Sequence, residues 1–491
     1  MAQRKSKHSS TKLQRAKVLS APSHTHGYRA PFSWWKAIAV LLVGILVFAG
    51  SIFSTVYAQL VSTVNEARVD LIAQKNVKQE IVDPNSGKAL NILLLGTDSR
   101  DGAENQAIGG SNDVGNHQAD TTMVVHISAN RQFIDIVSIP RDSIVSVPSC
   151  ETSNGTIPAQ RNIMFNSVFA TAYDRGGNLA SAASCTVSAV NALTGLNISQ
   201  FITVDFGGLK NMIDALGGVD VCISQDFSDR DANLTLSRGL NHLNGTDATQ
   251  FARVRHGLGD GSDIMRTVRQ QYLIKMLLRE ALKQNILTNF DKLFQLSTTA
   301  LKSLNISSGL ADTNILIGLA NSLKSFKVAS IYSQTVPVTT WSQDANRVVW
   351  TSGADELWTR IQEDRPLSDD GSESSSSTSG TTDSSTNTRT QAQQSQSQTQ
   401  QSQSQSQSQS QQTTTDSSTS SSTSSSTSST ENASTVDPNT GLMTQADGTL
   451  IDPKTGGYVD KDSGVIHNPT TGWSIGLADE YLNYTVCGIK S

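Results

Sequence analysis

The sequence lacks a strong excess of charge of either sign. Its 491 residues hold 38 Lys and Arg against 43 Asp and Glu, which gives a formal net charge of −5 at pH 7. Proteins that bind nucleic acid through its phosphates present a surplus of basic residues. We therefore expect no nucleic-acid partner.

Apolar residues are also scarce, at 36% of the chain, and the shortage has a local cause. Residues from about 369 to 434 are almost wholly Ser, Thr and Gln. Such a segment cannot bury enough apolar surface to fold. The sequence therefore predicts a disordered linker over residues 367–435, which separates one globular domain of ordinary size from a short C-terminal tail, residues 436–491.

Cysteine is rare, and no pair of cysteines has CxxC or another metal-site spacing, so we expect no structural zinc. Four cysteines fit an extracellular chain with up to two disulfides. Three pairings are open for Cys150, Cys185, Cys222 and Cys487. We favour Cys150 with Cys185, because the other two would then tie the tail to the domain across the Ser/Gln segment.

Charge is absent altogether from residues 37–58, whereas residues 1–36 hold eight Lys and Arg and no acid. At about 1.5 Å per residue this run spans the roughly 30 Å hydrocarbon layer of a bilayer. We predict a cytoplasmic tail over 1–36, a transmembrane helix over 37–58 and a juxtamembrane linker over 59–89. The basic flank stays inside, so the protein is expected to be a single-pass cell-membrane protein with an extracellular C-terminal domain.

A cleaved signal peptide is the alternative to that anchor, since Val56-Tyr57-Ala58 resembles a cleavage site. A mature N-terminus at Gln59 would decide for the signal peptide.

Four arginines lie close together in the sequence, between Gly245 and Gln271. We expect Arg253 and Arg255 to lie in extended backbone and to point to the same side. Arg266 and Gln270 are four apart in a periodic segment, so they share a helix face, and Asp263 is the expected N-cap. Converging guanidinium groups suit a phosphate or a pyrophosphate. A solvated charged surface is the alternative interpretation.

The globular domain opens with a continuous apolar run, Ile92–Leu95, which is typical of a strand buried on both faces. A turn with Asp98 and Arg100 follows it directly. In open α/β sheets, ligands bind beyond the carboxyl ends of the strands. We therefore count both residues as candidates for a site.

Residues 121–127 and 133–139 are expected to form an antiparallel pair, with Asp120 before the first strand and Arg141 after the second. Strands and helices alternate beyond them, which predicts an α/β sandwich with a mixed sheet. The other elements that the patterns predict are helices at about 161–173, 180–193, 207–216, 264–283, 290–303, 312–326 and 354–362, and strands at about 201–206, 219–224, 327–336 and 348–350.

The tail repeats a turn-forming pattern, Asp437–Gly441, which recurs at Asp452–Gly456 and is echoed at Asn468–Gly472. Such Asp, Pro, Asn and Gly clusters form turns, so we predict a small β-rich module. A calcium site is the alternative.

Taken in order, the motifs of the domain resemble the LytR–CpsA–Psr family of membrane-anchored cell-wall proteins. The likeness covers residues 90–366 and is carried by segments Asn91–Arg100 (NILLLGTDSR), Ala119–Val125 (ADTTMVV), Ser138–Ser143 (SIPRDS), Phe165-Asn166, Gly176-Gly177, Leu193–Leu196 (LTGL), Val204–Phe206 (VDF), Ile213–Val219 (IDALGGV), Gly239–Gly245 (GLNHLNG), Ala252–Arg255 (ARVR) and Asp263–Gln271.

The resemblance implies a three-layer α/β/α sandwich that binds a polyprenyl-pyrophosphate lipid. It implies an enzyme that attaches phosphate-linked glycopolymers, such as teichoic acid or capsule polysaccharide, to peptidoglycan. It also implies that Asp98 and Asp120 hold Mg²⁺, or Mn²⁺ in its place, and that Asp263 orients the arginines. The residues implied around the pyrophosphate are Arg100, Arg141, Arg253, Arg255, Arg266 and Gln270.

The implied reaction is attack of a peptidoglycan hydroxyl on the glycan-side phosphorus, with the lipid monophosphate as leaving group. Asp98, Asp120 and Arg141 are the predicted catalytic residues, and either aspartate is the candidate base. Two rival functions remain. One is a metal-dependent pyrophosphate hydrolase that uses water as acceptor. The other is a non-enzymatic wall-binding or adhesive protein displayed on the Ser/Gln linker.

Overall fold

The structure is a computed structural model that describes residues 34–84, 86–97, 117–254, 261–283, 290–323, 326–327, 330–367, 436–469 and 472–489. Asp98, Arg100, Arg255 and residues 368–435 of the predicted linker lie outside these residues. The chain divides into two compact units, residues 1–62 and 63–491.

Helix α1 covers Trp34–Glu66. No helix among the described residues was found to have the length and apolar character needed to cross a membrane. The span expected at 37–58 stays a prediction.

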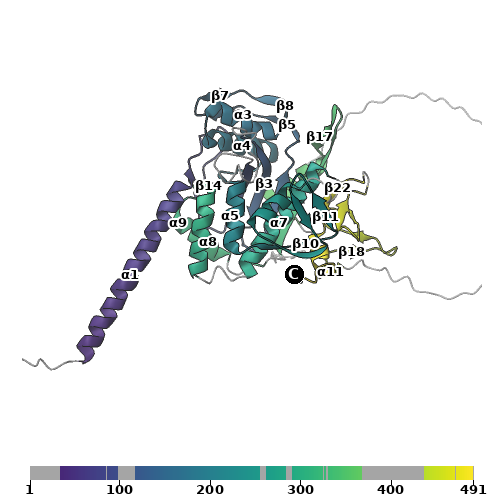
Figure 1. Cartoon of the computed structure of the whole chain (residues 1–491). Coiled ribbons are helices and arrows are strands. Elements are labelled where there is room, and N and C mark those ends of the chain that lie inside the picture. The colour runs from purple at the N-terminus through teal and green to yellow at the C-terminus, as the bar shows by residue number, and fades with distance from the viewer. Residues whose placement is uncertain are drawn as a thin grey trace, which may run out of the picture. The chain divides into compact units, whose positions relative to one another are not determined.

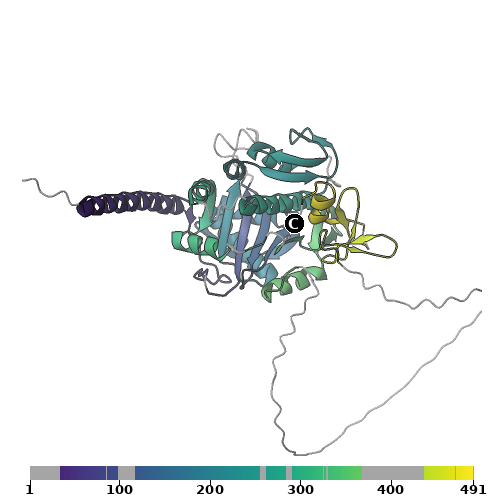
Figure 2. The ribbon, with the colours of Figure 1, turned by 90° about the horizontal axis from the view of Figure 1, so that it is seen from below.

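A seven-stranded mixed sheet forms the centre of the second unit (Figures 1 and 2). Parallel pairs join β1 to β14, β9 to β2 and β4 to β15, and the other neighbours are antiparallel. The mixed α/β sheet is thereby confirmed. In spatial order the strands are β1 (Arg68–Val69), β14 (Leu304–Ser307), β9 (Gln200–Asp205), β2 (Leu90–Thr97), β3 (Ala119–Ile127), β4 (Ile134–Ile139) and β15 (Ile331–Thr335).

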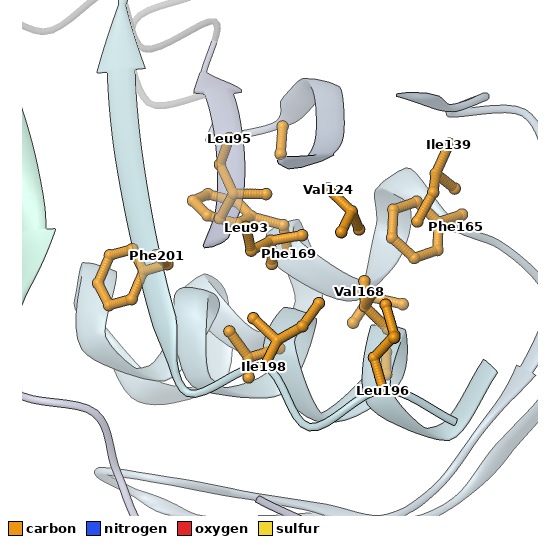
Figure 3. Close-up of a cluster of buried hydrophobic side chains, with 14 of the residues drawn as sticks. Leu93, Leu95, Val124, Ile139, Phe165, Val168, Phe169, Leu196, Ile198 and Phe201 are labelled. Atoms are coloured by element: carbon orange, nitrogen blue, oxygen red, sulfur yellow. The ribbon is translucent and has the colours of Figure 1, made fainter. Parts of the chain in front are cut away.

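Strand β2 shows why helices cover both faces of this sheet. Leu93 and Leu95 point into one buried cluster, with helices α3 (Asn166–Gly176), α4 (Leu179–Thr194) and α10 (Ser352–Gln362) (Figure 3). Ile92 and Leu94 point into another, with α7 (Asp263–Lys283) and α9 (Thr313–Ser322). Because successive side chains of a strand face opposite ways, an all-apolar strand needs a cover on each side. The result is a layer of helices on each face.

Helix α5 (Phe206–Leu216) lies between α7 and α8 (Phe290–Ser303) (Figure 1). Together these three helices enclose the cavity described below. The Asp205 carboxylate accepts from the backbone N–H of Gly208 at 2.7 Å and so caps the start of α5. Close packing leaves no room for a side chain at Gly208, because a Cβ there would lie 2.3 Å from the Ser303 carbonyl oxygen.

Two of the predicted elements are wrong. Residues 161–173 are not one helix, because β8 (Gln160–Met164) pairs with β5 (Ile144–Val147) before α3 begins. Pairing with a distant strand overrides the local periodicity there. Arg253 is not in extended backbone either, since it ends helix α6 (Gly245–Arg253).

Helix α6 forms because Asn244 caps it and one face is apolar. The Asn244 side chain accepts from the backbone N–H of Asp247 at 2.9 Å. Ala248, Phe251 and Ala252 are buried at helical spacing.

Short two-stranded units complete the main domain. They pair β6 (Cys150–Thr152) with β7 (Gly155–Ile157), β10 (Val219–Ile223) with β13 (Gly239–Leu243), β11 (Phe227–Asp229) with β12 (Leu234–Leu236), and β16 (Val338–Trp341) with β17 (Asp344–Trp350).

The two disulfides are Cys150–Cys185, with a Cα–Cα distance of 5.4 Å, and Cys222–Cys487, with 6.0 Å. The favoured pairing is confirmed. The first joins β6 to α4, and the second joins β10 to the C-terminal tail.

The tail folds as a five-stranded antiparallel meander followed by a short helix. The predicted turns close with backbone hydrogen bonds of 2.8 Å from Gly441, Gly456 and Gly472 to the first residue of each turn, and these glycines have positive φ. We call residues 436–489 the tail module. Its elements are β18 (Met443–Thr444), β19 (Leu450–Ile451), β20 (Tyr458–Val459), β21 (Val465–His467), β22 (Ser474–Leu477) and α11 (Asp479–Thr485).

Candidate active site

A network of charged side chains is centred on Arg141. Its Nη1 donates to Asp120 Oδ1 at 3.0 Å, and its Nε lies 3.1 Å from Asp263 Oδ1. Asp263 also accepts from Nη2 of Arg266. One carboxylate therefore holds the guanidinium groups of Arg141 and Arg266 close together.

Strand pairing brings these residues together from distant parts of the sequence. Because β3 and β4 are antiparallel, with Thr122 opposite Ile139, the start of β3 and the end of β4 share one sheet edge. Asp120 and Arg141 lie at that edge. Asp263 reaches them as the first residue of α7. It is not the N-cap that the sequence predicted, since the Ser262 hydroxyl accepts from the backbone N–H of Met265 at 3.2 Å.

The side chain of Gln270 forms hydrogen bonds with two elements of the site, β3 and α6. Its Oε1 accepts from the Thr121 hydroxyl at 2.8 Å, and its Nε2 donates to the Ala252 carbonyl at 3.3 Å. Gln270 thereby links β3 to α6 at the end where Arg253 lies. The guanidinium of Arg253 stacks over the ring of Phe206, 4.9 Å from its centroid.

A cavity of about 630 Å³ begins at these polar groups and continues between the helices. Its polar lining includes Asp120, Thr121, Arg253, Arg266 and Gln270. Its apolar lining comes mainly from α5, α7 and α8, and includes Leu209, Met212, Leu216, Leu273, Ile274, Leu277, Leu278, Ala281, Leu296 and Ala300, together with Leu304 of β14. The cavity therefore offers a charged end and an apolar interior to a single ligand.

The site concentrates charge away from water. Arg266 is 5% exposed. Burial raises the pKa of the Asp263 carboxyl, although the guanidinium groups of Arg266 and Arg141 act in the opposite direction. Burial alone would lower the pKa of Arg141, but the carboxylates of Asp120 and Asp263 outweigh it and raise that pKa. Arg141 therefore stays charged, and a phosphate brought here meets cations in a medium that screens them poorly.

Of the two predicted magnesium ligands, the structure describes Asp120. Asp120 lines the cavity, whereas Asp98 is outside the described residues. Within the described ranges, no group of three or more His, Cys, Asp and Glu side chains could hold a metal ion. Magnesium is commonly held by one or two carboxylates together with phosphate oxygens of a substrate. A carboxylate at the charged end of the cavity fits that donor set.

Three contacts of this region were not predicted from the sequence. Arg269, buried on α7, donates to the Val254 carbonyl and holds the end of α6. Arg347 of β17 donates to Asp142 at 2.9 Å. Trp473 of the tail module lines a second cavity beside Arg141. Their sequence separations leave no local pattern by which these contacts could have been predicted.

The model of the LytR_cpsA_psr family matches residues 54–363. The chain belongs to this family. The match starts ahead of Leu90, in agreement with the place of β1 in the central sheet.

Curated relatives within the LytR–CpsA–Psr family are moderately similar. A probable cell wall biosynthesis protein LcpB of Corynebacterium glutamicum is 29% identical over 279 residues, which are 55% of this chain and 61% of that protein. A polyisoprenyl-teichoic acid–peptidoglycan teichoic acid transferase, TagV of Bacillus subtilis, is 27% identical over 254 residues, 50% of this chain and 58% of that protein. The chain therefore spans about three fifths of the length of these relatives.

Among solved structures, a LytR-Csp2A-Psr enzyme from Actinomyces oris matches with a TM-score of 0.42 and 22% identity. The match covers 60% of this chain and 94% of that one.

Proposed function

We propose that the protein is a phosphotransferase that moves a glycan phosphate from a polyprenyl-pyrophosphate carrier to a hydroxyl of peptidoglycan. The observation that carries the proposal is one cavity whose lining includes Arg253 and Arg266 as well as many leucines of α5, α7 and α8. A polyprenyl pyrophosphate has the same division, with a dianionic head and a long apolar tail. Relatives named as polyisoprenyl-teichoic acid–peptidoglycan teichoic acid transferases support a polyprenyl-linked glycan as the donor, rather than another lipid phosphate.

The head group is bound by guanidinium groups that are already in place. Asp263 fixes Arg141 and Arg266 before the substrate arrives, so little side-chain ordering accompanies binding. Arg253, whose guanidinium lies over the ring of Phe206, supplies a further cation at the cavity. Arg100 and Arg255 complete the proposed set on the strength of their motifs alone.

The apolar interior receives the lipid. Side chains of α5, α7 and α8 line it, and the helices surround it on several sides. Burial of each methylene contributes about 0.8 kcal/mol, so a few isoprene units suffice for selective retention. The same burial positions the pyrophosphate, because the chain cannot slide out without exposing that surface.

The transfer step follows from this placement. The oxygen of a wall-sugar hydroxyl forms a bond to the glycan-side phosphorus while the bond from that phosphorus to the bridging oxygen breaks. The bridging oxygen leaves with the lipid monophosphate, and the hydroxyl proton passes to the carboxylate of Asp120 or Asp98. Arg141 and Arg266 stabilise the negative charge that develops on the phosphoryl oxygens and on the leaving group.

We further propose that Asp120 and Asp98 hold Mg²⁺, or Mn²⁺, against the pyrophosphate. A bound divalent cation would supply further neutralisation of the phosphate charge. The support for a metal at this position is Asp120. It lines the cavity, and the contact with Arg141 uses one of its two carboxylate oxygens, Oδ1.

We also propose that residues 37–58 anchor the protein in the cell membrane, with the domain outside. The support is the uncharged run itself and the basic segment before it. Donor lipid and enzyme then meet in two dimensions rather than three, which raises their effective concentration.

The test uses the full-length protein in detergent with a synthetic polyprenyl-pyrophosphate glycan and wall glycan fragments, with Mg²⁺ or with a chelator. Mass spectrometry reads the products. Arg141→Ala is the test variant, and Arg365→Ala is the control, because Arg365 is half exposed and pairs only locally with Glu363 among its described contacts. We expect a metal-dependent glycan-phosphate adduct with wild type and with the control, and none with Arg141→Ala.

Two other outcomes would contradict the proposal. Released glycan phosphate without any adduct would identify the hydrolase instead. No reaction and no binding of the lipid by wild type would leave the adhesive surface protein as the better interpretation.

A further inference from the structure

The tail module is part of the domain that holds the site, although the predicted linker separates the two in sequence. Cys487 is bonded to Cys222 of β10. Tyr272 of α7 accepts from the backbone N–H of Cys222 at 2.8 Å and donates to Asn483 at 2.9 Å. Lys275 of α7, 6% exposed, pairs with Asp479 at 2.8 Å. Figures 1 and 2 both place the tail module beside α7 and β10.

The contact with α7 matters because this helix carries the site. Asp263, Arg266 and Gln270 lie on its first two turns. Ile264, Met265 and Val268, on the same turns, form an apolar cluster with Val465 of the tail module. The tail module therefore packs directly behind the residues that hold the proposed head group.

A second cavity, of about 470 Å³, lies between the tail module and these residues. Arg141, Asp263 and Arg266 line one side of it, and Trp473 and Ser474 line another. Arg266 borders this cavity and the lipid-sized cavity alike. A group in the second cavity therefore has access to the phosphate position from the side away from the apolar interior.

A third cavity, of about 460 Å³, extends the second along the module's edge. Ile264 and Trp473 line both, so the two cavities are adjacent at these side chains. The third cavity is lined further by Glu356, Arg360, Lys454 and Asn468. Each volume lies in the usual range for a small-molecule site, and two in a row suit consecutive units of a chain molecule.

The lining of these cavities matches a sugar chain better than a second lipid or phosphate. Trp473 is 40% exposed and offers an apolar ring with a polar N–H edge. A sugar ring likewise has an apolar C–H face and a rim of hydroxyl groups, which donate and accept hydrogen bonds. The same cavity is lined by the amide of Asn346 and by the Arg347–Asp142 ion pair, whose charges already compensate each other.

We propose that the tail module forms one wall of the binding site for the acceptor glycan, and that Trp473 stacks on a sugar ring of it. The assignment rests on the proposed transferase function and adds the acceptor side of the site. A bound glycan chain would run through both outer cavities and present one hydroxyl beside Arg141 and Arg266. The C-terminal tail is then a specificity element of the enzyme, and Trp473 is a positioning residue for the acceptor.

The test measures glycan binding and transfer separately in the full-length protein. Wall glycan fragments without donor are titrated into wild type, Trp473→Ala and Trp473→Phe by calorimetry. Tyr484→Ala is the matched control, because Tyr484 is a similarly exposed aromatic of the tail module that lines neither cavity. We expect at least a tenfold weaker affinity for Trp473→Ala, near-normal affinity for Trp473→Phe, and no change for Tyr484→Ala.

Transfer kinetics give the second readout. Trp473→Ala should raise KM for the acceptor about tenfold and leave binding of the donor lipid unchanged, since Trp473 is not among the residues that line the apolar cavity. Equal glycan affinity in Trp473→Ala and wild type, or no glycan binding by wild type, would overturn the proposal. Glycan binding that depends on Trp473 in a protein that never consumes donor would support the glycan site while refuting the transferase.

Discussion

Lys275 of helix α7 is buried against Asp479 of the tail module, with Nζ 2.8 Å from Oδ2. Glu480 adds a second carboxylate at 3.2 Å. These carboxylates raise the pKa of Lys275 in spite of its burial. The buried positive charge of Lys275 on α7 is thus neutralised by two acidic residues near the C-terminus. The tail module and α7 are therefore expected to gain or lose stability together.

Lys275→Met should destabilise the domain by about 3 kcal/mol, because it leaves two partly buried carboxylates without their cation. The measurement is the urea dependence of unfolding. Lys210→Met is the control, since Lys210 forms an exposed i,i+4 pair with Asp214 and such pairs contribute roughly 0–1 kcal/mol. Equal losses for both variants would show that the tail module does not support α7.

Cleavage of the chain between residues 368 and 435 should leave two pieces that stay together. The Cys222–Cys487 disulfide joins the tail module to β10, whereas Cys150–Cys185 lies wholly within the first piece. A protease site inserted in this segment permits the experiment. We expect one band on a non-reducing gel after cleavage and two bands after reduction. Separation without reductant would rule out the pairing.

Arg141→Lys should lower transfer about 10²–10³-fold while the stability of the fold changes little. Lysine retains the charge but cannot contact Asp120 and Asp263 together with the geometry of a planar fork. Loss of one preformed donor to a developing oxyanion costs about that factor. Initial rates at saturating donor test this, and a rate within threefold of wild type would contradict the role given to Arg141.

Stability should fall as pH rises from about 4 to 7 because of Asp135 on β4. Burial raises the pKa of Asp135 to about 7 from an ordinary value of 3.8, although the N–H of Leu367 partly opposes it. In that window the folded protein retains a proton that the unfolded chain has released, so ionisation favours unfolding.

Asp135→Asn removes this titration. The free energy of unfolding of the variant, relative to wild type, should increase by roughly 2–3 kcal/mol between pH 5 and pH 7, at about 1.4 kcal/mol per pH unit. Comparison of the two proteins at each pH cancels the opposite contribution of His126, whose pKa is lowered mainly by burial. A difference that stays constant with pH would show that Asp135 is ionised in the folded protein.

Local sequence patterns determined most of the secondary structure. The apolar run at Ile92–Leu95 became the doubly buried β2, and Gly195 ends α4 with a φ of 69°. These features depend on a few neighbouring residues, namely side-chain periodicity and the backbone freedom of glycine. The ordered motifs likewise sufficed for the family.

Only the tertiary structure decided how the site is assembled. Asp263 has the sequence features of a helix cap, yet its carboxylate holds Arg141 and Arg266, because the start of α7 packs at the sheet edge where β4 ends. The place of Trp473 beside Arg141 depends on a disulfide and a buried ion pair across the length of the predicted linker. Periodicity and capping act over a few residues, whereas these contacts join segments whose separation leaves no trace in the local pattern.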